Sequence, residues 1–261
     1  MKKIAIYGKG GIGKSTTVSN VAVALAKKGY TVMQIGCDPK ADSTLSLREN
    51  KDRKSIKTVL DLIREKGNDF SLEDMAIRGA CGVICVEAGG PTPGVGCAGR
   101  GIIAALDKLK EKGAYEILKP DIVLYDVLGD VVCGGFSMPM RAGYADKVYI
   151  ITSGENMSIY AAANIAMAVQ GFKSKGYASL GGLILNHHDI EGYSDKRQGK
   201  KSEIEKASDL AADFDTQVIG ELSRSETVRE AEELGKTVVE AFPDSAMAEE
   251  YRKLAEVLLK Q

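Results

Sequence analysis

The stretch Gly8-Lys9-Gly10-Gly11-Ile12-Gly13-Lys14-Ser15 decides how this chain folds. It follows a short apolar run at residues 3–7 and precedes residues 16–28, whose apolar side chains recur at helical spacing. A strand, a glycine loop and a helix in this order place backbone N–H groups where they can surround phosphate oxygens. The alternative, a chance glycine turn at a helix start, is disfavoured by the full motif in this context. The stretch therefore predicts a phosphate-binding loop.

The side chains of this loop have separate expected roles. Lys14 is expected to reach the β- and γ-phosphates of a nucleotide, and the Ser15 hydroxyl is expected to ligate Mg²⁺. Lys9 is a second lysine that the phosphate cradle does not require, so it is solvated or serves a neighbouring phosphate or another subunit. The residues expected to bind the nucleotide here are Gly8, Lys9, Gly10, Gly11, Ile12, Gly13, Lys14, Ser15 and Thr16.

The rest of the chain alternates predicted strands with predicted helices. Strands are expected at residues 31–35, 82–87, 121–126, 147–152, 179–186 and 217–220. Helices are expected at residues 58–65, 71–78, 102–112, 158–173, 204–212, 226–234 and 245–259. This alternation predicts an α/β fold with a doubly wound, mostly parallel sheet and helices on both faces, as in P-loop nucleoside triphosphatases. We see no linker or repeat, so residues 1–261 are expected to form one domain.

Composition excludes several classes of partner. The 35 basic and 36 acidic residues nearly balance, which argues against nucleic acid or membrane as a partner. We find no signal peptide and no apolar stretch long enough to span a bilayer, so we expect a cytoplasmic protein. In a reducing compartment, cysteines are expected to be core thiols or metal ligands rather than disulfides. The five cysteines are Cys37, Cys81, Cys85, Cys97 and Cys133.

Acidic residues follow two of the predicted strands. Asp38 and Asp42 follow the strand at 31–35, and Asp126 ends the buried strand at 121–126. Ligands collect at the carboxyl ends of strands in open parallel sheets, so these carboxylates are expected near the nucleotide. Asp38 is expected to orient the attacking water, Asp42 to sense Mg²⁺ or the γ-phosphate, and Asp126 to approach the water shell of Mg²⁺. A helix cap is the alternative for Asp42.

The chain beyond Asp126 joins the nucleotide to a sulfur atom. Asp130 stands where P-loop proteins carry the segment that responds to the γ-phosphate. Cys133 follows three residues later, and three residues of chain reach at most about 10 Å. Any movement of Asp130 on hydrolysis is therefore expected to displace Cys133 as well.

Residues after the strand at 179–186 suggest a contact with the base. Asn186, at its end, could hydrogen-bond the adenine edge. The following pair, His187 and His188, is interpreted as a solvated loop rather than a metal site, because adjacent side chains point apart and no third ligand is near in sequence.

Cys97 lies in a glycine-rich loop just before the predicted helix at 102–112. N–H groups near a helix N-terminus stabilise a thiolate and any anionic cluster that it holds. A [4Fe–4S] cluster needs four thiolates, and the chain offers Cys97 and Cys133 in such settings. A two-fold dimer would supply all four. Spacing alone leaves two ordinary surface thiols as an open alternative.

Four segments resemble the nitrogenase iron protein family: residues 8–17, 36–43, 93–101 and 125–136. The similarity extends from residue 3 to about residue 186. It implies a homodimer with MgATP in each subunit and one [4Fe–4S] cluster bridged by Cys97 and Cys133 of each chain. It also implies ATP-driven one-electron transfer into a larger catalytic protein, with a low-potential donor such as ferredoxin or flavodoxin.

The resemblance carries roles to matching residues. Lys9 matches the lysine that reaches the partner subunit's nucleotide, and Asp38 matches the residue assigned to water activation. Asp126 and Asp130 match the nucleotide-sensing segment, and Arg100 matches an arginine that is ADP-ribosylated in some members. The expected catalytic residues are Lys9, Lys14, Asp38, Asp126 and Asp130. Additional nucleotide contacts are expected from Lys40, Asp42 and Asn186, and the cluster ligands from Cys97 and Cys133.

Three other functions stay open at this point. Relatives with the same architecture feed electrons to tetrapyrrole-reducing enzymes, such as the nickel-sirohydrochlorin diamide reductive cyclase of coenzyme F430 synthesis. A partitioning or scaffold ATPase with a deviant Walker A loop would also use Lys9, but it needs no cysteines in glycine loops. The sequence has no basic stripe and no terminal amphipathic anchor for such a role. A small-molecule kinase would need an acceptor site that the sequence does not reveal.

Overall fold

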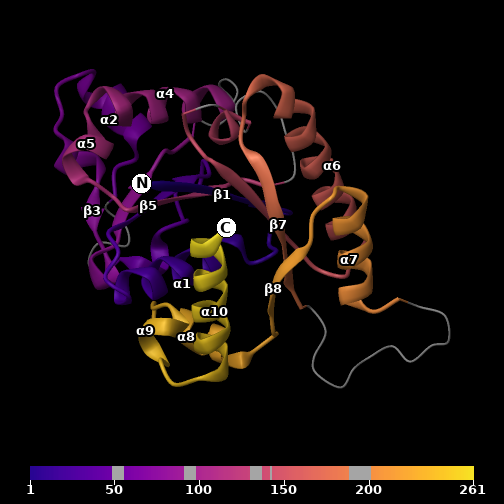
Figure 1. Ribbon diagram of the computed structural model, residues 1–261. Helices are drawn as coiled ribbons and strands as arrows, with labels where there is room; N and C mark the ends of the chain where they lie inside the picture. The colour runs from indigo at the N-terminus through magenta and orange to yellow at the C-terminus, as the bar shows by residue number, and fades with distance from the viewer. Residues whose placement is uncertain (49–55, 91–97, 130–136, 142, 188–200) are drawn as a thin grey trace.

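The computed structural model describes residues 1–48, 56–90, 98–129, 137–141, 143–187 and 201–261. Its centre is an eight-stranded sheet in the order β3-β4-β2-β5-β1-β6-β7-β8 (Figure 1). The pairs of this sheet are parallel except for β3 with β4. The strands are β1 (Lys2–Gly8), β2 (Val32–Cys37), β3 (Ile77–Arg78), β4 (Ile84–Glu87), β5 (Ile122–Val127), β6 (Lys147–Thr152), β7 (Ser179–Asn186) and β8 (Val218–Leu222).

Helices cover both faces of the sheet (Figure 1). One face carries α1 (Lys14–Lys27), α8 (Glu226–Glu233), α9 (Val238–Ala241) and α10 (Ala246–Lys260). The other carries α2 (Val59–Lys66), α3 (Leu72–Met75), α4 (Ala98–Glu111), α5 (Ala114–Leu118), α6 (Asn156–Phe172) and α7 (Glu203–Asp213). The predicted doubly wound, mostly parallel α/β fold is therefore confirmed.

Each central strand contributes to two separate apolar cores. In β1, Ile4 and Ile6 belong to the core beneath α1 and α10, whereas Ala5 and Tyr7 belong to the core on the opposite face. Successive side chains of a strand point to opposite faces, so a strand buried on both sides must be apolar throughout. This is why the short continuous apolar runs in the sequence became parallel strands.

Several helices begin at side-chain caps that the sequence encodes. Ser71 accepts a hydrogen bond from the backbone N–H of Asp74, whose carboxylate accepts one from the Ser71 backbone. This reciprocal pair of hydrogen bonds is a capping box, which the sequence Ser71-Leu72-Glu73-Asp74 encodes. Thr58 and Ser202 begin α2 and α7 in the same way.

Several predicted elements differ from the structure in extent. The strand expected at 31–35 continues to Cys37. The helix expected at 71–78 ends at Met75, and residues 77–78 pair antiparallel with β4 instead. The short helices α5 and α9 were not expected from the sequence.

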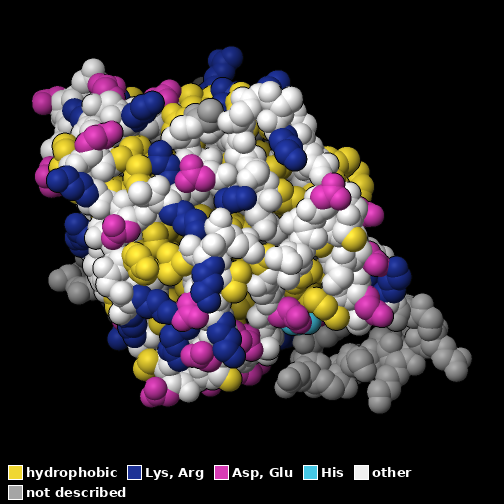
Figure 2. Space-filling view, in the orientation of Figure 1, with side chains coloured by type: hydrophobic (Ala, Val, Ile, Leu, Met, Phe, Trp, Pro, Cys, Tyr) yellow, Lys and Arg dark blue, Asp and Glu magenta, His cyan; other side chains and the backbone are white. Residues whose placement is uncertain are grey.

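The visible surface is mixed in charge. Figure 2 shows basic and acidic side chains intermixed over one face of the molecule, as the net charge of −1 leads one to expect. Within the described ranges, the helices are too short or too polar for any of them to cross a bilayer.

Candidate functional site

The loop between β1 and α1 depends on glycines at two positions. Gly8 has φ 149°, and a Cβ there would lie 2.3 Å from the carbonyl oxygen of Ile151 in β6. Gly13, with φ 89°, immediately precedes α1, whose first turn includes a bond from the Thr17 N–H to the Gly13 carbonyl. Only glycine adopts these conformations at no steric cost. The loop thus turns tightly at a helix N-terminus, where N–H groups and the helix dipole favour phosphate.

Lys14 is the basic group at the centre of this loop. Its side chain is buried, with 8% of the residue exposed. The ammonium donates a hydrogen bond of 3.0 Å to the carbonyl oxygen of Lys9, so it lies folded over the loop. A lysine held in this way supplies a point charge for phosphate oxygens. Lys9 itself is partly exposed.

Asp126, in β5, faces the loop from the neighbouring strand. It is 4% exposed and accepts a hydrogen bond of 2.6 Å from the Ser43 hydroxyl. Burial raises its pKa, and this is opposed by hydrogen bonds from Ser15 and Ser43 and by the charge of Lys14. A serine hydroxyl and a carboxylate side by side are the hard oxygen ligands that hold Mg²⁺ in P-loop proteins. The residues present therefore fit MgATP.

The segment after β2 brings a second carboxylate towards Asp126. Asp38 accepts a hydrogen bond of 2.8 Å from the Lys40 backbone N–H, which closes a turn. The charge of Asp38 contributes to the raised pKa of Asp126, so the two carboxyl groups are electrostatically coupled. Lys40 and Asp42 are exposed on the same segment.

Asn186 contacts the phosphate loop itself. Its side-chain N–H donates to the carbonyl oxygen of Ile12 at 2.8 Å, and a Cβ at Gly13 would lie 2.7 Å from the same nitrogen. The contact places Asn186 against the phosphate loop, which it braces. Any contact of Asn186 with adenine stays a prediction.

His187 is not the freely solvated residue that the sequence suggested. Its Nδ1 lies 2.9 Å from a Glu203 oxygen and its Nε2 3.1 Å from a Glu221 oxygen. Burial lowers the pKa of His187, but the hydrogen bonds and charges of the two glutamates outweigh this, so the net shift is upward. His187 therefore joins the ends of β7 and β8 to the start of α7. His188 lies outside the described residues.

Three of the predicted residues lie outside the described part of the chain: Cys97, Asp130 and Cys133. Arg100 is exposed in the first turn of α4, which begins directly after Cys97. Cys37, Cys81 and Cys85 are free thiols. Cys85 is fully buried in the apolar core beneath α1, and this burial raises its pKa to about 12. Among the described side chains, no group of three or more His, Cys, Asp or Glu could hold a metal ion.

Sequence reasoning missed Gly129. A Cβ at this position would lie 1.4 Å from the Gly8 carbonyl oxygen and 2.9 Å from the Lys14 ammonium. The chain after β5 therefore passes directly over the phosphate loop. A glycine three residues beyond the acidic end of a buried strand was the available signal. Ser43 was also missed, although it stands in a motif quoted above.

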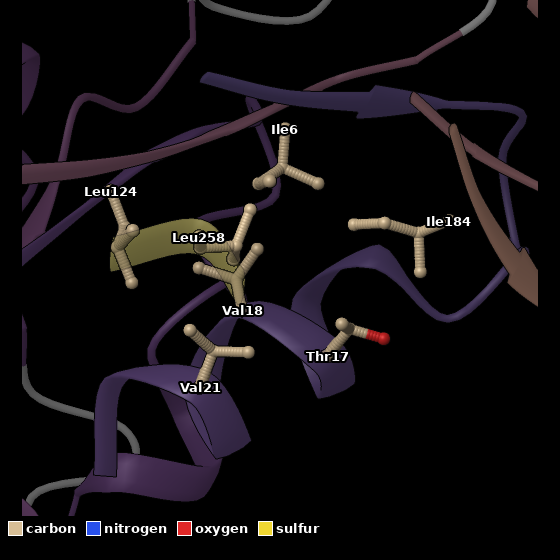
Figure 3. A pocket seen from close by; sticks show the side chains of 7 residues that line it. All are labelled: Ile6, Thr17, Val18, Val21, Leu124, Ile184 and Leu258. Carbon is tan, nitrogen blue, oxygen red and sulfur yellow. The ribbon is translucent and has the colours of Figure 1, made fainter. Parts of the chain in front are cut away.

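A small pocket lies between α1, α10 and the sheet (Figure 3). It is lined by Ile6, Thr17, Val18, Val21, Leu124, Ile184 and Leu258. This lining has no charged group to hold a phosphate, so the nucleotide site is the loop before α1 and not this pocket.

A glycine loop before α1 and a buried carboxylate on the adjacent strand, both at the carboxyl edge of a parallel sheet, define a P-loop nucleotide-binding protein. Solved structures share this fold. The cell division ATPase MinD of Pyrococcus furiosus matches with a TM-score of 0.72 and 21% identity, covering 100% of this chain and 99% of that one. A ParA family ATPase from Chlorobium tepidum TLS has a TM-score of 0.71 and 16% identity, covering 98% of each chain.

Sequence similarity identifies the family within this class. The chain belongs to the 4Fe-4S iron sulfur cluster binding proteins of the NifH/frxC family, whose model matches residues 2–261. Nitrogenase iron protein 2 of Methanothermococcus thermolithotrophicus is 46% identical over 267 residues, covering 98% of this chain and 87% of the relative. Nitrogenase iron protein of Methanospirillum hungatei JF-1 is 48% identical over 262 residues, covering 99% and 88%. The chain is thus an ATP-dependent reductase of this type, which binds a [4Fe–4S] cluster and MgATP.

Proposed function

We propose that two copies of this chain form a homodimer that delivers single electrons to a larger catalytic protein of the nitrogenase type. Cys97 and Cys133 of each copy would supply the four thiolates of one shared [4Fe–4S] cluster, which carries the electron. When bound, the cluster would supply a one-electron carrier between a ferredoxin or flavodoxin, as the reductant, and the catalytic protein, as the oxidant. Each copy hydrolyses MgATP to MgADP and phosphate. The names of the curated relatives support this proposal.

The observation that carries the proposal is the contact between the phosphate loop and the chain leading to Cys133. Asp126 is bonded to Ser43, and Gly129 is packed against the carbonyl of Gly8. From Gly129 to Cys133 the chain advances four residues, a reach of at most about 14 Å. A change at the phosphates therefore has a short covalent path to a cluster ligand.

The proposed roles follow from charge and position. Lys14 neutralises the β- and γ-phosphates, and Ser15 with Asp126 holds Mg²⁺. Asp38 orients the attacking water. Lys9, which is partly exposed, reaches the nucleotide of the other copy. Further proposed contacts are Thr16, Lys40, Asp42 and Asn186 with the nucleotide, Asp130 with the γ-phosphate region and Arg100 as an acceptor of ADP-ribose.

Replacing single cysteines tests the proposal. Anaerobically purified Cys97→Ser and Cys133→Ser should lose iron and the visible absorbance of the cluster, because the thiolate ligand is gone, and should still bind MgADP. Cys81→Ser is the matched control, since Cys81 is an exposed free thiol. It should keep its iron. Full iron content in either of the first two variants would contradict the ligand assignment, and an iron-free wild-type protein would favour a scaffold ATPase.

The identity of the acceptor needs a separate experiment. ADP with aluminium fluoride mimics the nucleotide during hydrolysis and should trap the closed complex. We expect the captured partner to be a catalytic protein of the nitrogenase type. Capture of a tetrapyrrole-reducing enzyme, such as the reductive cyclase of coenzyme F430 synthesis, would reassign the acceptor and leave the electron-delivery mechanism in place.

The proposed location is the cytoplasm. Cys37, Cys81 and Cys85 are free thiols, as is usual in a reducing compartment.

A further inference from the structure

Glu87, the last residue of β4, has a buried carboxyl group that the proposed mechanism does not use. The residue is 0% exposed. Its Oε1 accepts hydrogen bonds from the backbone N–H of Thr44 at 2.7 Å and from the Thr44 hydroxyl at 2.6 Å. The guanidinium of Arg48 lies 3.8 Å from the same oxygen. Its Oε2 is buried and has no hydrogen-bond partner among the residues that the structure describes. Such a group is costly to bury, so its retention calls for an explanation.

A glycine in the neighbouring strand makes room for this carboxyl group. Gly36 of β2 is in register with Glu87 on one side and with Asp126 on the other. A Cβ at Gly36 would lie 2.1 Å from Oε2 of Glu87 and 2.6 Å from Cβ of Ser43. Ser43 and the Glu87 carboxyl group therefore occupy the space above Gly36. This packing explains why β2 carries a glycine at the point where the sequence suggested that the strand had ended.

Two consecutive residues are consequently fixed by carboxyl groups from the two strands that flank β2. The Ser43 hydroxyl donates to Asp126, and Thr44 donates twice to Glu87. Asp126, in β5, belongs to the nucleotide site, whereas Glu87 lies in β4, on the other side of β2. The segment that starts at Asp38 is thus held at its far end by both groups.

We propose that Glu87 is a positioning residue for ATP hydrolysis, which acts by holding Thr44 and thereby fixing residues 38–44 relative to Asp126 and the phosphate loop. This inference rests on the proposed function, because it takes Asp38 to orient the attacking water. A misplacement of about 1 Å in such a segment is enough to slow a reaction about a hundredfold. Glu87 touches neither nucleotide nor water in this mechanism.

The electrostatic surroundings of Glu87 fit this role. Burial raises the pKa of the Glu87 carboxyl group to about 7, against the effect of the Thr44 hydrogen bonds and the charge of Arg48. The other titratable groups coupled to it are Asp126, Cys37 and Cys85. The ionised form makes the stronger, charge-assisted bonds to Thr44, so Thr44 is held more firmly as the carboxyl group loses its proton.

Glu87→Gln tests the inference, because it keeps the size of the side chain and removes its charge. For the full-length protein we expect kcat for phosphate release to fall about tenfold, with KM and the Kd for MgADP changed by less than about twofold. Hydrogen exchange at the Thr44 amide should become faster in the same variant. The control is Glu205→Gln, since Glu205 accepts the N–H and hydroxyl of Ser202 at 2.7 and 2.8 Å on an exposed helix cap.

Variants of Thr44 keep the inference testable if Glu87→Gln does not fold. Thr44→Val removes the hydroxyl donor and should lower kcat. Thr44→Ser keeps the donor and should have a kcat close to that of wild type. The effects of Glu87→Gln and Thr44→Val should not add, because they break one interaction. An unchanged kcat in folded Glu87→Gln, or additive effects of the two substitutions, would overturn the inference. A wild-type protein that does not hydrolyse ATP would instead overturn the proposed function.

Discussion

Replacing Gly129 with alanine tests the close contact between the chain after β5 and the phosphate loop. The new Cβ would lie 1.4 Å from the carbonyl oxygen of Gly8, where ordinary van der Waals contact begins at 3.4 Å. The two backbone segments would therefore have to separate by about 2 Å. The carbonyl oxygen belongs to the backbone and cannot rotate away as a flexible side chain could. Lys14, whose ammonium would lie 2.9 Å from the same Cβ, would also be displaced.

The expected consequence is a large loss of nucleotide function with a smaller loss of stability. Overpacking of this kind typically costs about 1–3 kcal/mol in the free energy of unfolding. A displacement of about 2 Å between groups that surround the phosphates should reduce ATP hydrolysis by about a hundredfold or more. We also expect the Kd for MgADP to rise, because the displaced Lys14 would bind the phosphates less well.

Isothermal titration with MgADP, phosphate release and thermal unfolding measure these three effects. The matched control is Gly171→Ala in α6, where a Cβ would meet no atom within 4 Å. Alanine in an exposed helix should stabilise the protein by about 0.5–1 kcal/mol and leave nucleotide binding unchanged. Wild-type affinity and hydrolysis in Gly129→Ala would show that Gly129 and the phosphate loop are not packed together in solution, and the reasoning would fail.

Three further predictions concern other contacts. Asn186→Ala removes the 2.8 Å hydrogen bond to the phosphate loop and should lower the free energy of unfolding by about 1 kcal/mol. Unfolding curves and MgADP titrations that match those of wild type would contradict this. The bonds of His187 to Glu203 and Glu221 raise its pKa, so their stabilising effect is present at low pH and is lost as the pH rises through that pKa. Denaturant titrations should show this loss in wild type and not in His187→Asn. Because the pKa of Glu87 is raised to about 7, the free energy of unfolding should fall by about 1.4 kcal/mol as the pH rises from about 6 to about 8.5. Glu87→Gln should not show this decrease.

The parallel strands and the phosphate loop could be predicted because local sequence determines them. The strands at 147–152 and 179–186 have the expected bounds, since a strand buried on both faces must be a continuous apolar run. The loop before α1 was equally predictable, because an ordinary glycine turn does not also require a lysine and a serine at fixed positions. Capping boxes such as that of Ser71 were predictable for the same reason.

Features that depend on distant partners could not be predicted. The strand β2 includes Gly36 because Glu87 and Ser43 fill the space above it, and neither contact is visible from local sequence. The two residues of β3 form a strand only because β4 lies beside them. His187 was misread because its glutamate partners lie 16 and 34 residues away.

The segment that follows β2 also touches the strand end that leads towards Cys97. A Cβ at Gly90 would lie 2.3 Å from the Pro39 side chain, and the Ala88 N–H donates 2.8 Å to the carbonyl of Gly36. The same segment meets β5, which leads towards Cys133, through Ser43. The two strand ends that lead towards Cys97 and Cys133 therefore contact the same backbone segment, residues 36–43. Breaking only one of these contacts should weaken, but not abolish, the response of the proposed cluster to nucleotide.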